Sequence, residues 1–242
     1  MKVMALYDIH GNVDALDAVL ADPRGASADL IVVGGDAIPG PFARETLARL
    51  AGLDLPVRWI RGNGEREVGE AIGRPMPEGD DMAPITDALT VSAIGDEQAR
   101  VCAGAPLTAE LDGVLYCHAS PRRDDEMLTR LSTAVRYAAA LADVELPVVV
   151  AGHTHQQDDR MVGGTRFVNA GSVGLPYEGD GDARWLWVED GVPSLRQTAY
   201  DHVAAGERIL AAGWPDEQST RAALVEPMEA ILITRLFEER TT

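Results

Sequence analysis

Lysine and cysteine are almost absent from this chain of 242 residues, which holds one lysine, Lys2, and two cysteines, Cys102 and Cys117. Two cysteines are too few for a disulfide framework, and the apolar run around Cys117 predicts a buried free thiol. No apolar run approaches the roughly 20 residues of a membrane span. The first residues lack the apolar core and cleavage site of a signal peptide. We therefore expect a cytoplasmic protein that contacts no membrane.

Positive charge is also scarce, since 21 Lys and Arg stand against 39 Asp and Glu, for a formal net charge of −18. Duplex nucleic acid and anionic membranes are bound through positive fields, so this balance excludes both as general partners. A small phosphate-containing substrate remains possible where the site itself is locally positive. The composition does not indicate an oligomeric state.

Short β-branched runs alternate with helical stretches, a pattern typical of an α/β protein. The expected strands are 3–7, 30–33, 57–60, 113–117, 147–151, 166–169, 183–189 and 194–200. The expected helices are 12–20, 43–50, 65–71, 85–89, 95–102, 126–141, 202–212 and 220–239, the last of them broken or kinked at Pro227. We expect one domain over 1–242, with a helical insertion or cap at about 65–112 and C-terminal helices at about 202–239.

Polar groups that can bind a metal follow five of the expected strands. They are Asp8, His10, Asp36, Asn63, His118, His153 and His155, and they include four of the five histidines. A lone Gly-Asp or Gly-Asn is usually a turn, and Asp8 alone could cap the following helix. Ligands of open α/β sheets bind beyond the carboxyl ends of the strands, so these side chains are expected to converge.

The chemistry of this set indicates transition metals. Two carboxylates, one amide oxygen and four imidazoles suit Mn, Fe, Zn or Ni better than Ca or Mg, which prefer oxygen ligands. Seven ligands exceed the need of one tetrahedral ion, and with one bridging carboxylate they fit two metals about 3.5–4 Å apart. We expect two divalent or trivalent ions, manganese first, with Fe, Zn, Ni and Co as alternatives.

Two further residues are candidates for binding substrate. Asn12 stands where a helix begins, so its side chain and the helix N-terminus can face an anion. Arg61, just before Gly62-Asn63, could orient a phosphate, although a surface arginine at a strand end is an equally good interpretation. Arg122 and Arg123 are weaker candidates, and His202, expected at an exposed position in the first turn of a helix, is assigned no role.

Read together, these motifs resemble those of the calcineurin-like metallophosphoesterases. The matching segments are Asp8-Ile9-His10-Gly11-Asn12, Gly35-Asp36, Gly62-Asn63, His118 and Gly152-His153-Thr154-His155. The later segment 169–174 resembles the Asn-Pro-Gly-Ser-Val-Gly segment of small bacterial members, so the resemblance spans about 1–200. It is nearest to a compact bacterial branch with small phosphodiesterases and some dinucleoside tetraphosphate hydrolases. The fold it implies is a four-layer αββα sandwich of two mixed β-sheets.

The resemblance also implies roles for the seven residues. Asp8, His10, Asp36 and His155 would hold one metal, and Asp36 would bridge to a second one held by Asn63, His118 and His153. The implied enzyme is a phosphoesterase of small phosphodiesters or nucleotide phosphoanhydrides, with Asp36, Asn63 and His118 as catalytic residues. Its nucleophile would be a hydroxide that bridges the two metals.

One position departs from the pattern of the protein phosphatases in this superfamily. Their general acid is a His that follows Gly-Asn, whereas here Gly64 follows, and Glu65 is expected to orient a ligand. Without an acid, good leaving groups such as anhydrides or activated diesters are favoured over phosphoserine. A phosphoprotein phosphatase and a non-catalytic scaffold of the same fold remain as alternatives. The walls of the pocket are expected from residues 65–112 and 176–182.

Overall fold

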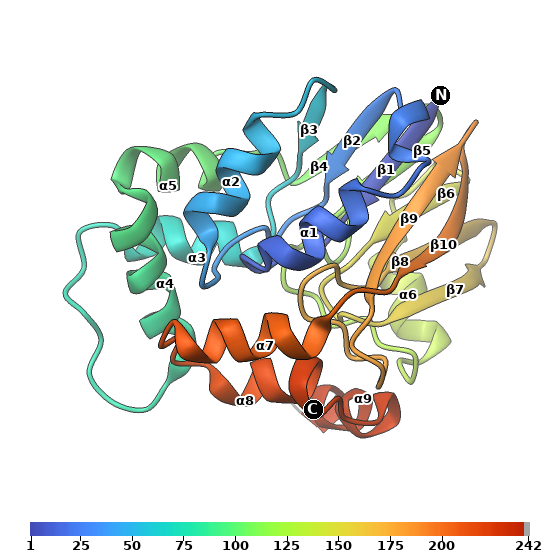
Figure 1. Cartoon of the computed structure of the whole chain (residues 1–242). Coiled ribbons are helices and arrows are strands. Elements are labelled where there is room, and N and C mark those ends of the chain that lie inside the picture. Colours follow the sequence, from blue (N-terminus) through green and yellow to red (C-terminus); the bar gives the residue numbers. More distant parts are fainter. Residues whose placement is uncertain (240–242) are drawn as a thin grey trace.

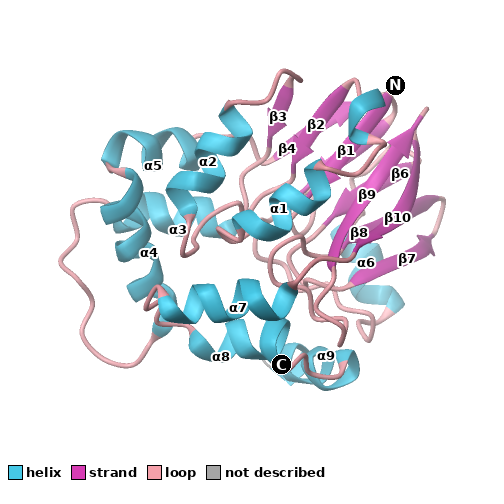
Figure 2. Ribbon diagram, viewed as in Figure 1, coloured by secondary structure: helices cyan, strands magenta, loops and turns pink. Residues whose placement is uncertain are grey.

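The structure, a computed structural model that describes residues 1–239, contains two five-stranded sheets with helices outside them (Figures 1 and 2). The first sheet has the order β10-β9-β1-β2-β3. Strands β1 (Lys2–Leu6), β2 (Leu30–Val33) and β3 (Val57–Trp59) run parallel. Strand β9 (Ala183–Glu189) is antiparallel to β1 and to β10 (Val192–Thr198).

The second sheet has the order β4-β5-β6-β8-β7. Its three parallel strands are β5 (Val114–Cys117), β6 (Val148–Ala151) and β8 (Thr165–Ala170), and the edge strands β4 (Thr108–Leu111) and β7 (Gln157–Val162) are antiparallel to their neighbours. The sequence analysis missed both edge strands. Because β7 contains mainly polar residues and no side chain of it is fully buried, it lacks the apolar run by which the central strands were found.

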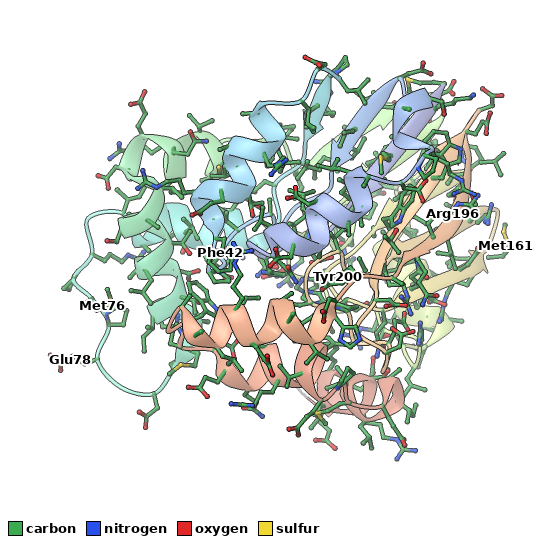
Figure 3. The ribbon with its side chains drawn as sticks, in the orientation of Figure 1. Phe42, Met76, Glu78, Met161, Arg196 and Tyr200 are labelled. Carbon is green, nitrogen blue, oxygen red and sulfur yellow. The ribbon has the colours of Figure 1, made fainter. Side chains whose placement is uncertain are left out.

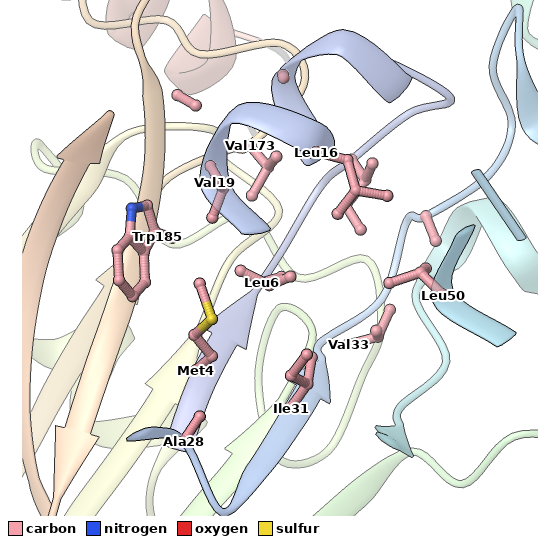
Figure 4. Close-up of a cluster of buried hydrophobic side chains, with 14 of the residues drawn as sticks. Met4, Leu6, Leu16, Val19, Ala28, Ile31, Val33, Leu50, Val173 and Trp185 are labelled. Carbon is pink, nitrogen blue, oxygen red and sulfur yellow. The ribbon is translucent and has the colours of Figure 1, made fainter. Parts of the chain in front are cut away.

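Alternation of side chains along β1 shows how the layers form. Val3 and Ala5 face the second sheet and join the core between the sheets. Met4 and Leu6 point the other way, into a cluster with Leu16 of helix α1 (Val13–Leu20) (Figure 4). Helix α6 (Ala134–Ala140) covers the outer face of the second sheet through a third cluster. The chain is thus an αββα sandwich of two mixed sheets, as expected.

The remaining helices form two groups at the ends of the strands. Helices α3 (Asn63–Ala71), α4 (Met82–Ile94) and α5 (Asp96–Ala103) pack on one another beside α2 (Ala43–Ala51). Met76 and Glu78 project from the loop between α3 and α4 (Figure 3). Helices α7 (His202–Ala211), α8 (Glu217–Thr220) and α9 (Ala230–Glu239), with a π-helical turn at Arg221–Val225, lie along the lower side in Figure 1.

The structure decides several expectations about helices, cysteines and membrane spans. The helix expected over 126–141 was wrong in its first half, since the Thr133 side chain accepts a hydrogen bond from the Arg136 N–H and starts α6 there. The interruption at Pro227 is confirmed, because it lies between the π-helical turn and α9. Cys102 and Cys117 are both buried and free. Within residues 1–239, no helix is both long enough and apolar enough to cross a membrane.

Candidate metal centre

The loops that follow the parallel strands of both sheets bring the predicted ligands together. Two groups form, and within each group the ligand atoms all lie within 4.8 Å of one another. Asp8, His10 and His155 make the first group, and Asp36, His118 and His153 make the second. Residues from the ends of β1, β2, β5 and β6 thus meet at one edge of the sandwich, as the strand-end pattern predicts.

Asp36 lies between the two groups. Its Oδ2 is 3.4 Å from His118 Nε2 and 3.7 Å from His10 Nε2. On the other side, His155 Nε2 is 3.3 Å from Asp8 Oδ1 and 3.2 Å from His10 Nε2. A carboxylate that reaches both groups is placed to bridge two cations, and the partition of the residues agrees with the two ligand sets that the resemblance implies.

The backbone at the ligands adopts conformations that side chains usually avoid. In the described part of the chain, seven residues other than glycine have a positive φ, and five of them are Asp8, His10, Asp36, His153 and His155. Such residues cost free energy of order 1–3 kcal/mol each and cluster at functional sites. Because five of these strained residues lie in the two candidate ligand groups, the strain supports a functional role for the loops that carry them.

Three backbone carbonyls fix the tautomers of the histidines. His10 Nδ1 lies 3.2 Å from the Pro39 carbonyl, His118 Nδ1 lies 3.0 Å from Gly34, and His155 Nδ1 lies 2.8 Å from Leu175. Because a carbonyl oxygen only accepts hydrogen bonds, each Nδ1 carries the hydrogen, and each neutral ring offers the lone pair of Nε2 to the centre. The Nε2 lone pairs of His10 and His155 therefore face each other, an arrangement that calls for a cation between them.

Unpartnered polar atoms give the same result. Among the described residues, nine buried side-chain atoms have no hydrogen-bond partner, although such atoms are normally satisfied, and three of them are Asp8 Oδ1, Asn63 Oδ1 and His118 Nε2. All three belong to predicted ligands, and all three carry lone pairs that a metal accepts. The residues present therefore fit two metal ions.

The electrostatics of the centre also favour positive charge. Burial lowers the pKa of His118, but the carboxylates of Asp36 and Asp8 outweigh this effect and raise the pKa to about 10. Burial and the neighbouring His118 lower the pKa of His153 to about 4. Without a metal, these carboxylates hold a proton on His118 Nε2, and a bound cation would replace that proton. His153 stays neutral and keeps a lone pair for a ligand bond.

Glu65 braces the loop of Asp36, in keeping with the expectation that it orients a ligand. Its buried carboxylate accepts hydrogen bonds of 2.8 Å from the N–H groups of Asp36, Ala37 and Gly62. Burial, followed by the charge of Asp36, raises the pKa of Glu65 to about 7, against the pull of these donors. Its contacts hold the loops before α2 and α3 in register.

Gly64 is required by the packing. Its N–H donates to Asp36 Oδ1 at 2.7 Å, and a Cβ at this position would lie 2.3 Å from the Ile38 carbonyl oxygen and 2.7 Å from Pro39 Cδ. The histidine found here in the protein phosphatases would not fit without a shift of the backbone.

The segment 169–174 supports the ligand loops from behind, a role that sequence reasoning did not assign. The Asn169 side chain donates to the Gly152 carbonyl at 2.6 Å, and Ser172 Oγ donates to the Asp8 carbonyl at 2.7 Å. Gly152 also approaches Asp8 closely, since a Cβ there would lie 2.5 Å from Asp8 Oδ2. The signal for this role in the sequence was the presence of Asn169, Gly171 and Ser172 at the end of a predicted strand.

The two candidates for substrate binding are engaged elsewhere. Asn12 is buried, caps α1 by accepting from the Ala15 N–H, and donates to the Gly174 carbonyl and to Tyr200 Oη. Arg61 faces Asp124, with Nε 3.4 Å from Oδ2. Neither residue lines the cavity over the ligands. This geometry favours the capping role for Asn12 and the structural interpretation of Arg61.

The remaining basic and histidine candidates also lie off the centre. Arg122 pairs with Glu126, and Arg123 pairs with Asp125 at 2.8 Å. His202 was expected to be exposed, which was wrong, because the ring is partly buried and its Nδ1 lies 2.7 Å from the Leu224 carbonyl. That contact holds α7 against the π-helical turn.

A cavity of about 340 Å³ lies over the ligands and has His10, Asp36, Asn63, His153 and His155 among its lining residues. Residues from the two expected wall segments line it as well, among them Glu67, Asp87 and Tyr177. The sequence analysis missed a further wall formed by the C-terminal helices. That wall includes Trp214, Asp216, Thr220 and Phe237.

Charge in this cavity comes from acids and histidines alone. Within the part of the chain that the structure describes, its lining contains Asp36, Glu67, Asp87 and Asp216 but neither lysine nor arginine. Tyr177 stacks on His155 with ring centroids 5.0 Å apart, and Phe237 meets Tyr177 edge to face at 5.9 Å. The cavity thus pairs a floor of metal ligands with aromatic and acidic walls.

Comparison with known proteins places this site in context. A family model described as the calcineurin-like phosphoesterase superfamily domain matches residues 1–188. A metallophosphoesterase from Sphaerobacter thermophilus is 24% identical, with a TM-score of 0.74 over 93% of this chain and 99% of that chain. A hypothetical protein from Pyrococcus horikoshii OT3 is 20% identical, with a TM-score of 0.78 over 95% and 99%. No curated protein matches the chain significantly.

Proposed function

Since the chain belongs to the calcineurin-like phosphoesterase superfamily and is a metal-dependent phosphoric ester hydrolase, we propose that it hydrolyses small phosphodiesters or nucleotide phosphoanhydrides at a dinuclear centre. The single observation that carries this proposal is the pair of ligand groups that meet at Asp36 on the floor of the cavity. We propose manganese as the metal, the cytoplasm as the location and a small phosphate compound as the partner.

The residues divide into two sets of ligands in this proposal. Asp8, His10 and His155 would hold one metal, Asn63, His118 and His153 would hold the other, and Asp36 is within reach of both groups. When bound, two such cations would make water more acidic and would offset negative charge that develops on the phosphate oxygens.

The chain's own groups keep this arrangement in place. The Pro39, Gly34 and Leu175 carbonyls hold three imidazoles in the tautomer that presents Nε2. The Gly64 N–H orients Asp36 by holding its Oδ1, which leaves Oδ2 directed between the groups. Preorganised ligands of this kind reduce the reorganisation needed during the reaction.

Of the two substrate classes, the charge of the cavity favours phosphodiesters. Two divalent cations would bring about +4 against the two carboxylates of Asp8 and Asp36, which suits one phosphate group at the floor. Further phosphates of a polyphosphate would face Glu67, Asp87 and Asp216 without a basic side chain in the lining. A diester carries one negative charge and leaves its organic groups to the aromatic wall.

The proposal is tested with metal-free protein reloaded with Mn²⁺. We expect turnover of bis-p-nitrophenyl phosphate that disappears on chelation and returns with metal, and we expect two metal equivalents per chain by elemental analysis. Diadenosine tetraphosphate and a phosphoserine peptide, assayed beside it, separate the diester class from the anhydride class and from a phosphoprotein phosphatase.

The outcomes separate the alternatives clearly. No turnover of any of these substrates with Mn, Ni, Co or Fe would overturn the proposal in favour of a non-catalytic scaffold. Comparable kcat/KM on the phosphoserine peptide and on the diester would favour the phosphoprotein phosphatase instead.

A further inference from the structure

Gly64 stands where the protein phosphatases have a general acid, and it lines the cavity over the ligands. The wall of this cavity also holds a carboxyl group, Asp87, to which no role has been assigned so far. Asp87 lies on α4, and its side chain is 6% exposed. Among residues 1–239, the Asp87 side chain has no hydrogen-bond partner and no ion-pair partner. Its carboxyl oxygens are open to the cavity rather than sealed in the protein. The group is therefore available to a substrate bound there.

The face of α4 that carries Asp87 is built toward the cavity. Ala83, Thr86 and Asp87 stand at the spacing of one helical face, and all three line the cavity. The buried residues of this helix are Thr86, Asp87 and Thr90, which are polar where a core-facing helix would present apolar groups. This face is therefore the wall of a site rather than part of a hydrophobic core.

The other carboxylates of the lining are already occupied. Asp36 is a predicted ligand, and Glu67 Oε1 pairs with Arg66 at 3.2 Å. Asp216 caps α8 by accepting from the Ser219 N–H at 3.0 Å. Asp87 is thus the carboxyl group of the described lining that is left for the substrate.

We propose that Asp87 is the general acid that protonates the leaving oxygen of a phosphodiester, an inference that rests on the proposed function. The oxygen of water forms the new P–O bond, and the ester P–O bond breaks with its electron pair on the leaving oxygen. That oxygen takes the proton of Asp87 and departs as an alcohol, and the carboxylate regains a proton from solvent. The cavity is at the small end of ligand sites, so a substrate that fills it contacts both floor and wall.

The surroundings of Asp87 support the protonated form. Burial is the main cause, followed by the charges of Glu67, Asp36 and Glu70, and together they raise the pKa of Asp87 to about 7, with Arg66 opposing them. A general acid works best when its pKa is near the working pH. Cations at the floor would lower this pKa, while Glu67 and Glu70 continue to raise it.

The test compares two esters that differ only in how much the leaving group needs a proton. Methyl p-nitrophenyl phosphate releases a weak base, and methyl phenyl phosphate releases a stronger one. With Mn²⁺-loaded protein, we expect Asp87→Asn to lower kcat/KM for the phenyl ester about 100-fold and for the p-nitrophenyl ester less than about 3-fold. Asp87→Glu should restore part of the difference, and Asp80→Asn, on the exposed loop beside α4, should change neither.

A second measurement does not depend on turnover. Near neutral pH, the infrared spectrum of the loaded wild type should contain the C=O band of a protonated carboxyl group that Asp87→Asn lacks. Equal losses on both esters, loss of a metal equivalent in Asp87→Asn, or absence of the band would overturn the role of Asp87. Failure of the wild type on both esters would instead overturn the proposed function.

Discussion

The floor and the wall of the cavity are built in different ways. The floor consists of residues at the ends of strands, whose histidines are held by backbone carbonyls and whose backbone is strained at five positions. The wall consists of side chains from helices α4 and α7–α9 and from the segment between α7 and α8, such as Asp87, Phe237 and Trp214. The comparison separates a floor of candidate metal ligands at the strand ends from a wall of side chains that other elements place around the cavity.

The two parts are nevertheless connected. Gln156, next to His155, is buried and donates to the Ala230 carbonyl of α9 at 2.7 Å, and Thr234 Oγ1 donates to its Oε1 at 2.7 Å. On the other side, Arg208 of α7 pairs with Asp14 of α1 at 2.6 Å and lies over the ring of Phe42. These contacts lie outside the metal ligands themselves, so we expect substitutions of wall side chains that make none of them to change substrate binding while the floor keeps its metals.

The largest effect should come from the floor. Asp36→Ala removes the carboxylate that lies between the two groups, and we expect turnover of bis-p-nitrophenyl phosphate to fall at least about 1,000-fold, with loss of bound metal. Elemental analysis and steady-state assays measure the two effects. Asp54→Asn, a substitution at an exposed position in the loop between α2 and β3, is the control. Full metal content and turnover in Asp36→Ala would contradict the assignment of the floor.

Glu65→Gln tests how strongly the floor depends on its brace. The amide has one accepting oxygen where the carboxylate has two, and its NH₂ group faces backbone N–H donors. We expect the free energy of unfolding to fall by about 1–3 kcal/mol and metal affinity to fall about 10- to 100-fold. Chemical denaturation and metal titration measure these values. Wild-type results in both would show that Glu65 does not position Asp36.

Trp214→Ala tests the wall alone. Loss of an aromatic contact of about 1–1.5 kcal/mol should raise KM for an aryl diester about 5- to 10-fold, with kcat and metal content nearly unchanged. Gln218→Ala, exposed on α8, should leave KM as it is. A fall in kcat or metal content in Trp214→Ala would mean that floor and wall are not separable in this way.

The pH dependence of the stability of the metal-free protein tests Asp87, a residue of the wall. The pKa of Asp87 is raised to about 7 in the fold, so ionisation of this carboxyl destabilises the native state as pH rises from about 4 to about 7. Asp87→Asn removes that cost. We expect its Tm to gain on the wild type across this window and to keep the gain above it. A constant difference in Tm from pH 4 to pH 8 would show that Asp87 is not buried as an acid.

The smallest effect is expected at Arg61. Because its guanidinium faces Asp124 and does not line the cavity, Arg61→Gln should change KM for a diester less than about twofold and cost about 1 kcal/mol or less in stability. Steady-state assays and thermal unfolding measure both. A tenfold rise in KM would restore Arg61 as a phosphate ligand.

Much of the floor could be predicted because its signal is local. Most of the candidate ligands follow a buried apolar strand, whereas Asn63 follows β3, which is only partly buried. Because the carboxyl ends of parallel strands meet at one edge, order along the chain was enough to predict that these residues lie close together. The wall had no such signal. Trp214 lies between α7 and α8 and Phe237 lies on α9, and neither stands in a motif. Contacts such as those of Gln156 with α9 and of Arg208 with Phe42 hold this part of the chain near the centre.

Two outcomes depend on contacts between segments far apart in the chain. Asn12 had the right residue type at a helix N-terminus, but the side chain caps its own helix and bonds to the Gly174 carbonyl, contacts that depend on a segment 162 residues away. Strand β7 was missed because pairing with β8, rather than an apolar run, makes it a strand.

By itself, the sequence determined the order of the central strands along the chain and the candidate metal ligands at their ends, because these follow from residue types at fixed local positions. Only the tertiary structure decided which groups share Asp36, which candidate anion ligands are used up elsewhere, and that Asp87 stands without a partner over the centre. Those properties depend on distances between segments far apart in the chain, and such distances are set when the two sheets and the C-terminal helices pack together.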